Sequence, residues 1–587
     1  MRLAARRPSI DEDSRGIMRR SLVVHAVAQA SALFLVCACW GGSAPPGPAG
    51  GRGTVQKVYY NGIIHTLDPR APLASAIAVR GDRIIAVGSS RELLSGLSPA
   101  AGRIDLRGRA VIPGLVDAHC HFMGYAEERA WIDLLGTSSI DQILQKVSTK
   151  KASAAPGSWI LGRGWDQNDW SDPTYPDKDS LDRIAPDNPV YLVRVCGHAA
   201  YVNSRTLAAA GISRDTKDPV GGKILRDAAG EPTGVLLDEA KEMVARIVPP
   251  PGDAEKKRLA VEAAEACLAV GLVGVHEMGI SMETDSLYEE LYAEKALALR
   301  IVAYWSGDDP NFERMLERGP VRGLADDHFS IVGCKFYADG SLGARSAALL
   351  QDYSDDPGNR GIIVTDPEKL ASNVRACQAQ GFQSAIHAIG DAGVREALDV
   401  YARVLAESPA PDARLRIEHS QVVSPEDIPR FAALGVVPSM QFIHCTSDMD
   451  WAAKRLGPER VKNAYVWRSL LDAGNRIPGG SDFPVEPINP LLGIYAAVTR
   501  ENLSGKPVGG WFPAQRLTVQ EAVRAFTVDA AWAAHEEDVS GSLAPGKRAD
   551  FIILSDDVFS VRPEVIPRIK VLETIIGGEI VYRADRF

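Results

Sequence analysis

Short apolar runs alternate with longer amphipathic stretches through the middle of the chain. The runs have the length of buried β-strands and cover residues 111–116, 159–163, 272–276, 330–336, 383–387, 415–419, 436–440 and 476–479. Apolar residues at i, i+3 and i+4 predict helices between them, over 255–270, 367–380, 393–407 and 424–433. Repeated strand–helix units form parallel sheets, and eight of them close into a barrel. We therefore predict an α/β fold with a (β/α)₈ TIM-type barrel.

The two ends of the folded region show short strands separated by tight turns instead. Residues 57–60, 76–79, 83–87 and 105–112 have this pattern, and it returns at 550–554, 571–576 and 579–582. This predicts a small β-sandwich domain built from both chain ends (55–112 and 536–587) beside a barrel of residues 113–535. The interval between the second and third predicted strands exceeds one βα unit, so we expect an insertion over about 125–255.

Residues 1–54 differ from the rest of the chain. Arg19-Arg20 precedes an apolar run over 21–38 that is too short for a membrane span, and a Gly/Pro/Ala-rich tether covers 41–53. The segment VCAC at 36–39 resembles a bacterial lipobox, whose last cysteine is lipidated. We expect export to the periplasm or cell envelope. If the lipobox is functional, Cys39 carries a lipid anchor to the membrane and Met18 is the start of the chain. A buried amphipathic helix is the alternative.

Composition and charge narrow the class of partner. The formal net charge is −10, from 65 basic and 75 acidic residues, which argues against nucleic acid because phosphate backbones require a basic surface. Outside the export segment the cysteines form no CxxC pair, so we expect small buried hydrophobic residues, with a disulfide left open. We expect a small-molecule substrate, and a homodimer stays open.

The first candidate for chemistry is the pair His119 and His121 at the end of the predicted strand 111–116. In extended backbone, residues i and i+2 share a face, so both imidazoles can reach one ion while Cys120 points away. Neutral imidazole is a good zinc ligand. Alone, the pair predicts only a metal site.

Further ligand-type residues lie at the ends of later predicted strands, namely Lys335, His387, His419 and Asp482. The carboxyl ends of barrel strands meet on one face, where active sites form. If these side chains were structural, each would need its own buried hydrogen-bond partner, at a cost of about 1–3 kcal/mol if unpaired. Convergence on a metal explains all of them together.

The sequence from about residue 55 onward resembles the amidohydrolase superfamily. The resemblance is closest to its family 3 branch, which includes N-substituted formamide deformylase and the exoenzyme-regulatory-protein-like hydrolases. The segments that carry it are PGLVDAHCH (113–121), KFYADGSLG (335–343), HAIGD (387–391), IEH (417–419), GSDFP (480–484) and GSLAPGKRAD (541–550).

This resemblance implies a role for each ligand residue. His119 and His121 match ligands of the more buried metal, and Asp482 matches a ligand that also takes a proton from water. His387 and His419 match residues that hold a second metal or contact the substrate. Lys335 matches a lysine that is carboxylated in binuclear members, so the implied cofactor is one zinc ion, or two if Lys335 carries a carbamate. An unmodified ammonium there would repel zinc.

The implied function is hydrolysis of an amide or formamide C–N bond. Zinc lowers the pKa of a bound water to about 7, Asp482 acts as general base, and a metal or a histidine such as His419 polarises the carbonyl. A non-catalytic scaffold on the same fold is the alternative, although scaffolds of this kind lose ligands that this chain keeps. Ester or lactone hydrolysis on the same site also stays open.

Several residues are weaker candidates. Trp165, Asp166 and His198 match family segments near the pocket and are predicted to line the substrate site, although a structural turn explains the first two equally well. His276 and His444 are further candidates for the pocket, although the sequence favours ordinary hydrogen-bonded histidines at both positions.

Overall fold

The computed structural model describes residues 55–585 apart from 168–169, 195–198 and 220–221. The predicted export segment, including Cys39 and Met18, lies outside these residues, as does His198. In the part of the chain that is described, none of the helices is long and apolar enough to cross a bilayer.

Eight parallel strands form a barrel in the middle of the chain. In spatial order they are β6 (Leu115–Cys120), β13 (Leu272–Ile280), β14 (Arg300–Ser306), β16 (Phe329–Tyr337), β17 (Gln383–Ala388), β18 (Arg416–His419), β19 (Val437–Gln441) and β20 (Gly479–Gly480). The last strand returns to the first, because the amide of Asp482 donates to the His119 carbonyl and that of His121 to the Phe483 carbonyl, both at 2.8 Å. The TIM-type barrel is therefore confirmed. A short strand, β15 (Val321–Gly323), adds antiparallel to β16.

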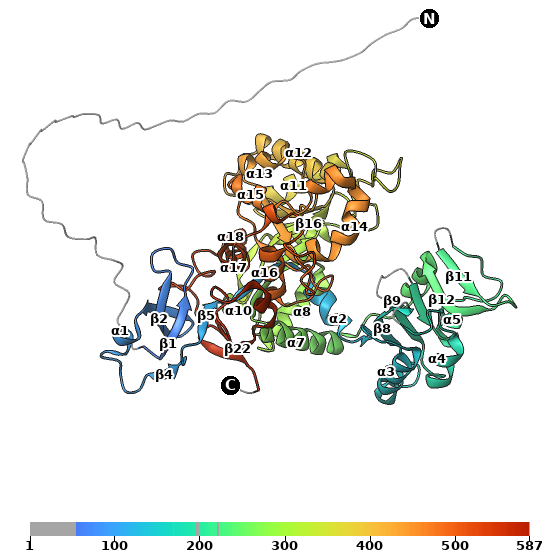
Figure 1. The fold of residues 1–587 in the computed structure, drawn as a ribbon, viewed down its shortest axis with the longest axis horizontal. Helices are drawn as coiled ribbons and strands as arrows, with labels where there is room; N and C mark the ends of the chain where they lie inside the picture. Colours follow the sequence, from blue (N-terminus) through green and yellow to red (C-terminus); the bar gives the residue numbers. More distant parts are fainter. Residues whose placement is uncertain (1–54, 168–169, 195–198, 220–221, 586–587) are drawn as a thin grey trace, which may run out of the picture. The chain divides into compact units, whose positions relative to one another are not determined.

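Helices follow the barrel strands and surround β16 in Figure 1. They include α7 (Asp253–Ala269), α8 (Met282–Ala293), α9 (Phe312–Arg318), α11 (Pro367–Ala379), α12 (Asp391–Glu407), α13 (Ile428–Leu434), α14 (Phe442–Arg460), α16 (Pro490–Thr499), α17 (Val519–Ala525) and α18 (Val528–Ala533). In α12 the buried residues Val394, Ala397, Leu398 and Tyr401 lie at positions i, i+3, i+4 and i+7 and face the barrel core. The helices predicted from this period are confirmed to within a few residues.

Two expected barrel strands are corrected by the structure. The segment predicted at 159–163 is β8 (Ile160–Trp165), and it belongs to the insertion, where it pairs in parallel with its neighbours. A buried parallel strand has the same apolar pattern in either sheet, which is why the prediction was wrong. The barrel strand that the apolar pattern did not predict is β14.

The predicted strand 111–116 is also two strands. β5 (Ala110–Pro113) pairs with the terminal sheet, and β6 begins at Leu115 in the barrel. Gly114 lies at the crossing, where a Cβ atom would come within 2.3 Å of the Val273 side chain. Glycine therefore permits the chain to pass closely from one sheet into the other.

Strands from both chain ends form a separate sheet. Its order is β23 (Glu579–Arg583), β22 (Val571–Ile576), β21 (Phe551–Leu554), β5, β1 (Lys57–His65), β2 (Leu73–Arg80) and β3 (Arg83–Gly88), with β4 (Gly102–Asp105) beside β1. Figure 1 shows the blue strands and the red β22 together. Tyr59 and Phe551 pack edge to face in its core, with ring centroids 4.9 Å apart. This confirms a domain built from both ends.

The insertion carries a six-stranded sheet of its own. The strand order is β11 (Gly222–Arg226), β12 (Pro232–Asp238), β10 (Ala199–Val202), β9 (Val190–Arg194), β8 and β7 (Ile132–Asp133). Helices α3 (Ile140–Ser153), α4 (Lys178–Ile184), α5 (Ser204–Ala209) and α6 (Glu239–Ala245) belong to the same segment. It follows α2 (Phe122–Glu128) in sequence and ends before α7, which places it in the chain between the first two barrel strands.

The described cysteines are all free and buried: Cys120, Cys267, Cys334, Cys377 and Cys445. They behave as the small hydrophobic residues expected from their spacing. Cys196 lies outside the described residues.

Candidate metal centre

The His-x-His pair lies where β6 ends and α2 begins. His119 is completely buried, whereas the side chain of His121 is 34% exposed. The Nε2 atoms of both rings lie 3.3 Å from Oδ1 of Asp482, which follows β20. Cys120, between them, turns its sulfur toward the His276 carbonyl, 3.6 Å away. Because side chains alternate along β6, both imidazoles face the carboxylate of Asp482, which follows the last barrel strand.

A buried carboxylate fixes the orientation of His119. Oε2 of Glu418 lies 2.6 Å from Nδ1 of His119, and Arg416 donates to both oxygens of the same carboxylate. Burial opposes ionisation of Glu418, but the Arg416 charge and His119 outweigh it and hold its pKa well below the usual range. An ionised acceptor keeps the proton on Nδ1, so Nε2 presents a lone pair toward Asp482.

Asp482 offers an oxygen that no described group satisfies. Its Oδ1 and the Nε2 of His119 are both buried and make no hydrogen bond. Burial raises the pKa of Asp482, but the adjacent imidazole rings of His119, His121 and His444 hold it well below the usual range. Two buried acceptor atoms that face each other with no hydrogen between them cost free energy, unless a cation lies between them. The residues therefore fit a metal ion.

Asp482 belongs to two groups of possible metal ligands, the first with His119 and His121 and the second with His419 and His444. Ligand atoms of His419, His444 and Asp482 lie within 4.8 Å of one another, as do those of His119, His121 and Asp482. Nδ1 of His419, at the end of β18, lies 2.7 Å from Oε1 of Gln441. With the Gln441 amide oriented this way, Nδ1–H of His419 donates a hydrogen bond to Oε1 of Gln441, and the lone pair of Nε2 can bind a cation. This favours a ligand role for His419 over a hydrogen-bond donor to a substrate carbonyl.

His444 also lies in this group, which favours the pocket role over that of an ordinary hydrogen-bonded histidine. Its Nδ1 is 3.0 Å from Oε1 of Glu486 and its Nε2 is 3.5 Å from Oδ2 of Asp482. Burial opposes the imidazolium, but the two carboxylates outweigh it and raise the pKa of His444 to about 10. The sequence signal was its place three residues beyond β19, on the same barrel face as the other strand ends.

Lys335 and His387 lie on the neighbouring strands β16 and β17. The rings of His387 and His419 are 4.5 Å apart between centroids, and Nε2 of His387 is 3.3 Å from the Gly340 carbonyl. Burial, followed by the Lys335 charge, lowers the pKa of His387 to about 3. Burial also lowers the pKa of Lys335, whose Nζ lies 4.9 Å from the centre of the Tyr337 ring. Both groups therefore lose their protons more readily here than in water.

The predicted substrate residues lie in the insertion. Trp165 is completely buried in its core, and the indole N–H donates to the Leu192 carbonyl at 2.8 Å. These contacts favour the structural interpretation of Trp165. Asp166 is partly buried and pairs with Arg194 at 2.5 Å. His198 lies outside the described residues.

A groove borders the candidate site. Its lining combines apolar and charged side chains from α2, the first part of the insertion and the turn after Asp482, namely Tyr125, Glu128, Arg129, Trp131, Ile132, Asp133, Leu135, Arg163, Gly164, Pro484, Val485, Glu486, Pro487 and Ile488. Glu486 belongs both to this lining and to the His444 contact. The groove therefore offers space for the part of a substrate that extends beyond the reacting bond.

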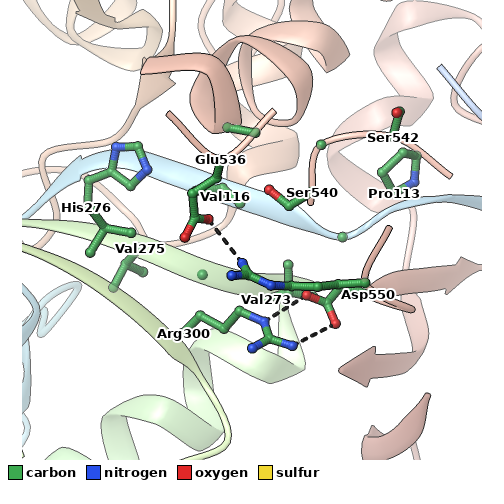
Figure 2. A pocket seen from close by; sticks show the side chains of 16 residues that line it. Pro113, Val116, Val273, Val275, His276, Arg300, Glu536, Ser540, Ser542 and Asp550 are labelled. Atoms are coloured by element: carbon green, nitrogen blue, oxygen red, sulfur yellow. Dashed lines mark hydrogen bonds and ion pairs between the residues drawn. The ribbon is translucent and has the colours of Figure 1, made fainter. Parts of the chain in front are cut away.

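A different cavity lies at the starts of the barrel strands (Figure 2). It contains His276, whose Nδ1 is 3.1 Å from Arg416, and the ion pairs Arg300–Asp550 and Arg548–Glu536. Because the candidate ligands lie at the opposite ends of the strands, this cavity belongs to the packing of the terminal sheet. His276 is a hydrogen-bonded core histidine in this structure.

Comparison with known proteins agrees with this geometry. The family described as Amidohydrolase family (Amidohydro_3) matches residues 103–582. The chain is 37% identical to "Protein LONG AFTER FAR-RED 3" of Arabidopsis thaliana over 89% of its length and 91% of that protein. It is 28% identical to N-substituted formamide deformylase of Arthrobacter pascens, over 89% of this chain and 97% of the relative.

A solved structure extends the comparison to the fold. An uncharacterized metal-dependent hydrolase from Pyrococcus furiosus superimposes with a TM-score of 0.71 and 29% identity, covering 86% of this chain and all of that protein. The barrel, the terminal sheet and the strand-end histidines and aspartate are thus parts of one metal-dependent hydrolase fold. The chain belongs to the amidohydrolase family.

Proposed function

We propose that this protein is a zinc-dependent amidohydrolase that cleaves an amide or formamide C–N bond in a small molecule. The observation that carries the proposal is the buried Oδ1 of Asp482, which makes no hydrogen bond and lies 3.3 Å from Nε2 of both His119 and His121. The choice of bond is supported by similarity to N-substituted formamide deformylase along nearly the whole of that relative.

The donor set suits zinc. His119, His121 and Asp482 would hold the first ion through two imidazoles and a carboxylate, which are common ligands of catalytic zinc. When bound, the ion supplies Lewis-acid activation of water and of the substrate carbonyl. Glu418 keeps the His119 ring in the ligand orientation, so the protein determines the position of the site before an ion arrives.

Lys335 would contribute after carboxylation. Its buried amine has a lowered pKa, so a larger fraction is neutral and can react with carbon dioxide. In that reaction the nitrogen forms a bond to carbon and releases one proton, and the product is a carbamate anion. The change turns a cation that repels metal into an anionic ligand beside His387 and His419.

Asp482 would move the proton during hydrolysis. The carboxylate is ionised at neutral pH and is held in place through its backbone amide, which donates to His119. It can accept a proton from the attacking water and pass it to the leaving nitrogen, so that the products are a carboxylic acid and an amine. The bordering groove would hold the remainder of the substrate.

The test is hydrolysis by the zinc-loaded protein of a panel of formamides, N-acyl amino acids, cyclic amides and lactones. We expect turnover of formamides or other amides, and a fall of about 10²–10⁴-fold in kcat for Asp482→Asn with the fold retained. Asp529→Asn, at another buried carboxylate in α18, is the matched control and keeps wild-type turnover.

Other results assign other functions. Cleavage of lactones alone would make the protein an esterase or lactonase on the same site. A folded protein that binds no divalent ion and turns over no compound of the panel would be a non-catalytic scaffold. Wild-type rates in Asp482→Asn would overturn the proposed role of that carboxylate.

A further inference from the structure

Two residues of the groove, Tyr125 and Arg129, follow the candidate ligand His121 at successive turns of α2. The Tyr125 amide donates to the His121 carbonyl at 2.9 Å, and the Arg129 amide donates to the Tyr125 carbonyl at 3.2 Å. Because a helix rises about 1.5 Å per residue, the Cα atom of Arg129 lies about 12 Å along the helix axis from that of His121. A substrate that reacts beside His121 and extends along α2 therefore passes an aromatic ring and then reaches a guanidinium group.

The walls of this path are largely apolar. The Tyr125 ring packs edge to face against that of Phe483, with centroids 5.4 Å apart, and Phe483 directly follows Asp482. Leu135 and Val485 also line the groove, and they are 67% and 64% exposed. The groove has a volume of about 750 Å³, which is in the range of sites for small molecules. Exposed apolar side chains in such a groove fit an apolar segment of a ligand.

The Arg129 guanidinium has no carboxylate within ion-pair distance in the described part of the chain. Its side chain is exposed and contacts Tyr125, where Nη1 donates to the phenol oxygen at 3.1 Å and the guanidinium carbon lies 5.6 Å from the ring centre. The other arginine of the groove, Arg163, pairs with Glu128 at 2.6 Å. A guanidinium binds a carboxylate through two parallel hydrogen bonds, so Arg129 can receive an anionic group from a ligand.

The other charges of the groove favour a singly charged group. Its lining contains three carboxylates and two guanidinium groups. Glu128 and Glu486 are paired with Arg163 and His444, and Asp133 accepts a backbone amide at 3.0 Å. A doubly charged phosphate would meet more repulsion from these carboxylates than a carboxylate with one charge.

We propose that Arg129 selects a substrate that carries a carboxylate at the far end of an apolar segment, as in an N-formyl ω-amino acid. The reacting carbonyl lies beside His121, the apolar segment lies against Tyr125 and the exposed aliphatic side chains, and the carboxylate binds Arg129. The inference rests on the proposed function, because it takes the reaction to occur at the strand-end ligands. Arg129 determines specificity in this arrangement and takes no part in the chemical step.

The experiment compares N-formylglycine, N-formyl-γ-aminobutyrate and N-formyl-ε-aminocaproate with neutral N-(hydroxyalkyl)formamides of the same lengths. Formate release gives kcat and KM for zinc-loaded wild type, Arg129→Gln and Arg129→Lys. Arg258→Gln is the matched control, because this arginine is exposed on α7, where it pairs with Glu255 and Glu262, and does not line the groove. Circular dichroism confirms the fold of each variant.

We expect kcat/KM of wild type to rise with the length of the carboxylate compounds. For the longest compound it should exceed the value for the neutral counterpart by about 10–100-fold, which corresponds to hydrogen bonds between charged groups. Arg129→Gln should lose this preference through a higher KM with kcat unchanged, whereas Arg129→Lys should retain part of it. Equal kcat/KM for the two series in wild type, or an unchanged preference in Arg129→Gln, would overturn the inference.

Two further outcomes separate this inference from the proposed function. Hydrolysis of other amides by wild type, without hydrolysis of either series, would overturn the inference and leave the proposed function in place. If the folded, zinc-loaded protein hydrolysed no amide at all, the result would contradict the proposed function and the inference together.

Discussion

Two candidate ligands have an unusual backbone conformation. His419 and Asp482 have φ angles of 73° and 63°, in the left-handed region that non-glycine residues rarely adopt. Each such residue costs on the order of 1–3 kcal/mol, and such strain is typical of functional sites. Both directly end or follow a barrel strand, so the strained turn directs the side chain inward across the barrel mouth. The strained backbone therefore occurs at two residues whose side chains belong to the same candidate metal-binding group.

At this scale the clearest prediction concerns Glu418. Glu418→Gln keeps the size of the side chain but removes the charge that orients His119 and pairs with Arg416. We expect metal affinity to fall by about 10–100-fold, because a second-shell carboxylate fixes the tautomer and basicity of its histidine. Chelator competition measures the change. Glu407→Gln, at an exposed pair with Arg375, serves as control, and equal affinities in the two variants would contradict the role of Glu418.

Residue types and strand ends predict six candidate ligands. The structure brings four of them, His119, His121, His419 and Asp482, into candidate metal-binding groups, but the partners of these side chains were not predicted. Glu418 and Glu486 carry no spacing signal, since their roles depend on which ring nitrogen they reach in the folded protein. His444 has a weaker sequence signal than the six, because it lies on a helix and not at the last residue of a strand. Its signal is its position just after the end of β19. Trp165 is buried in the core of the insertion, and family likeness alone does not distinguish such a side chain from one that lines a pocket.

At the scale of elements, the barrel depends on a close approach between its first and last strands. Gly480 in β20 faces the end of β6, where a Cβ atom would lie 2.7 Å from the His119 amide nitrogen and 2.8 Å from Oδ1 of Asp117. Asp117 in turn accepts hydrogen bonds from the amide and hydroxyl of Ser481. The junction between the strands therefore has no room for a side chain, and the same junction carries ligands from both sides.

We predict that Gly480→Ala lowers stability and metal affinity together. Overpacking against backbone costs about 1–3 kcal/mol, and relief requires β6 to shift with His119. Thermal unfolding and zinc competition are the two measurements. Gly102→Ala is the control, because a Cβ there meets its nearest neighbour at an ordinary 3.5 Å. A stability loss with unchanged zinc affinity would show that the junction does not position the ligand.

Periodicity predicted most elements, and its failures have a physical cause. β8 and β14 are both buried strands in parallel pairings, so local pattern cannot tell which of the two sheets each joins. β14 also begins with Arg300, and a charged residue is not expected in a core strand unless its ion-pair partner, here Asp550, is known. The break between β5 and β6 was hidden because two buried strands in succession have the pattern of one. Membership of a sheet is set by long-range contacts that no local window contains.

For the folded region as a whole, the terminal sheet is attached at the starts of the barrel strands through buried charges (Figure 2). Arg300, at the first residue of β14, donates to both oxygens of Asp550 at 2.7 and 3.1 Å. Both side chains are only 8% exposed. Asp550 also accepts the Gly577 amide at 2.7 Å, so one carboxylate connects a barrel strand to the turn between two strands of the terminal sheet.

Asp550→Ala should therefore destabilise the protein by roughly 3–5 kcal/mol, because it leaves the Arg300 charge buried without its partner. Urea unfolding measures the loss, and Glu368→Ala, which breaks an exposed pair with Arg403, should cost at most about 1 kcal/mol. Replacing both partners by apolar residues, in Arg300→Met with Asp550→Leu, should recover much of the loss, since no unpaired charge remains. If the single and double variants were equally unstable, packing and the Gly577 contact would hold the domains together, and the ion pair would not.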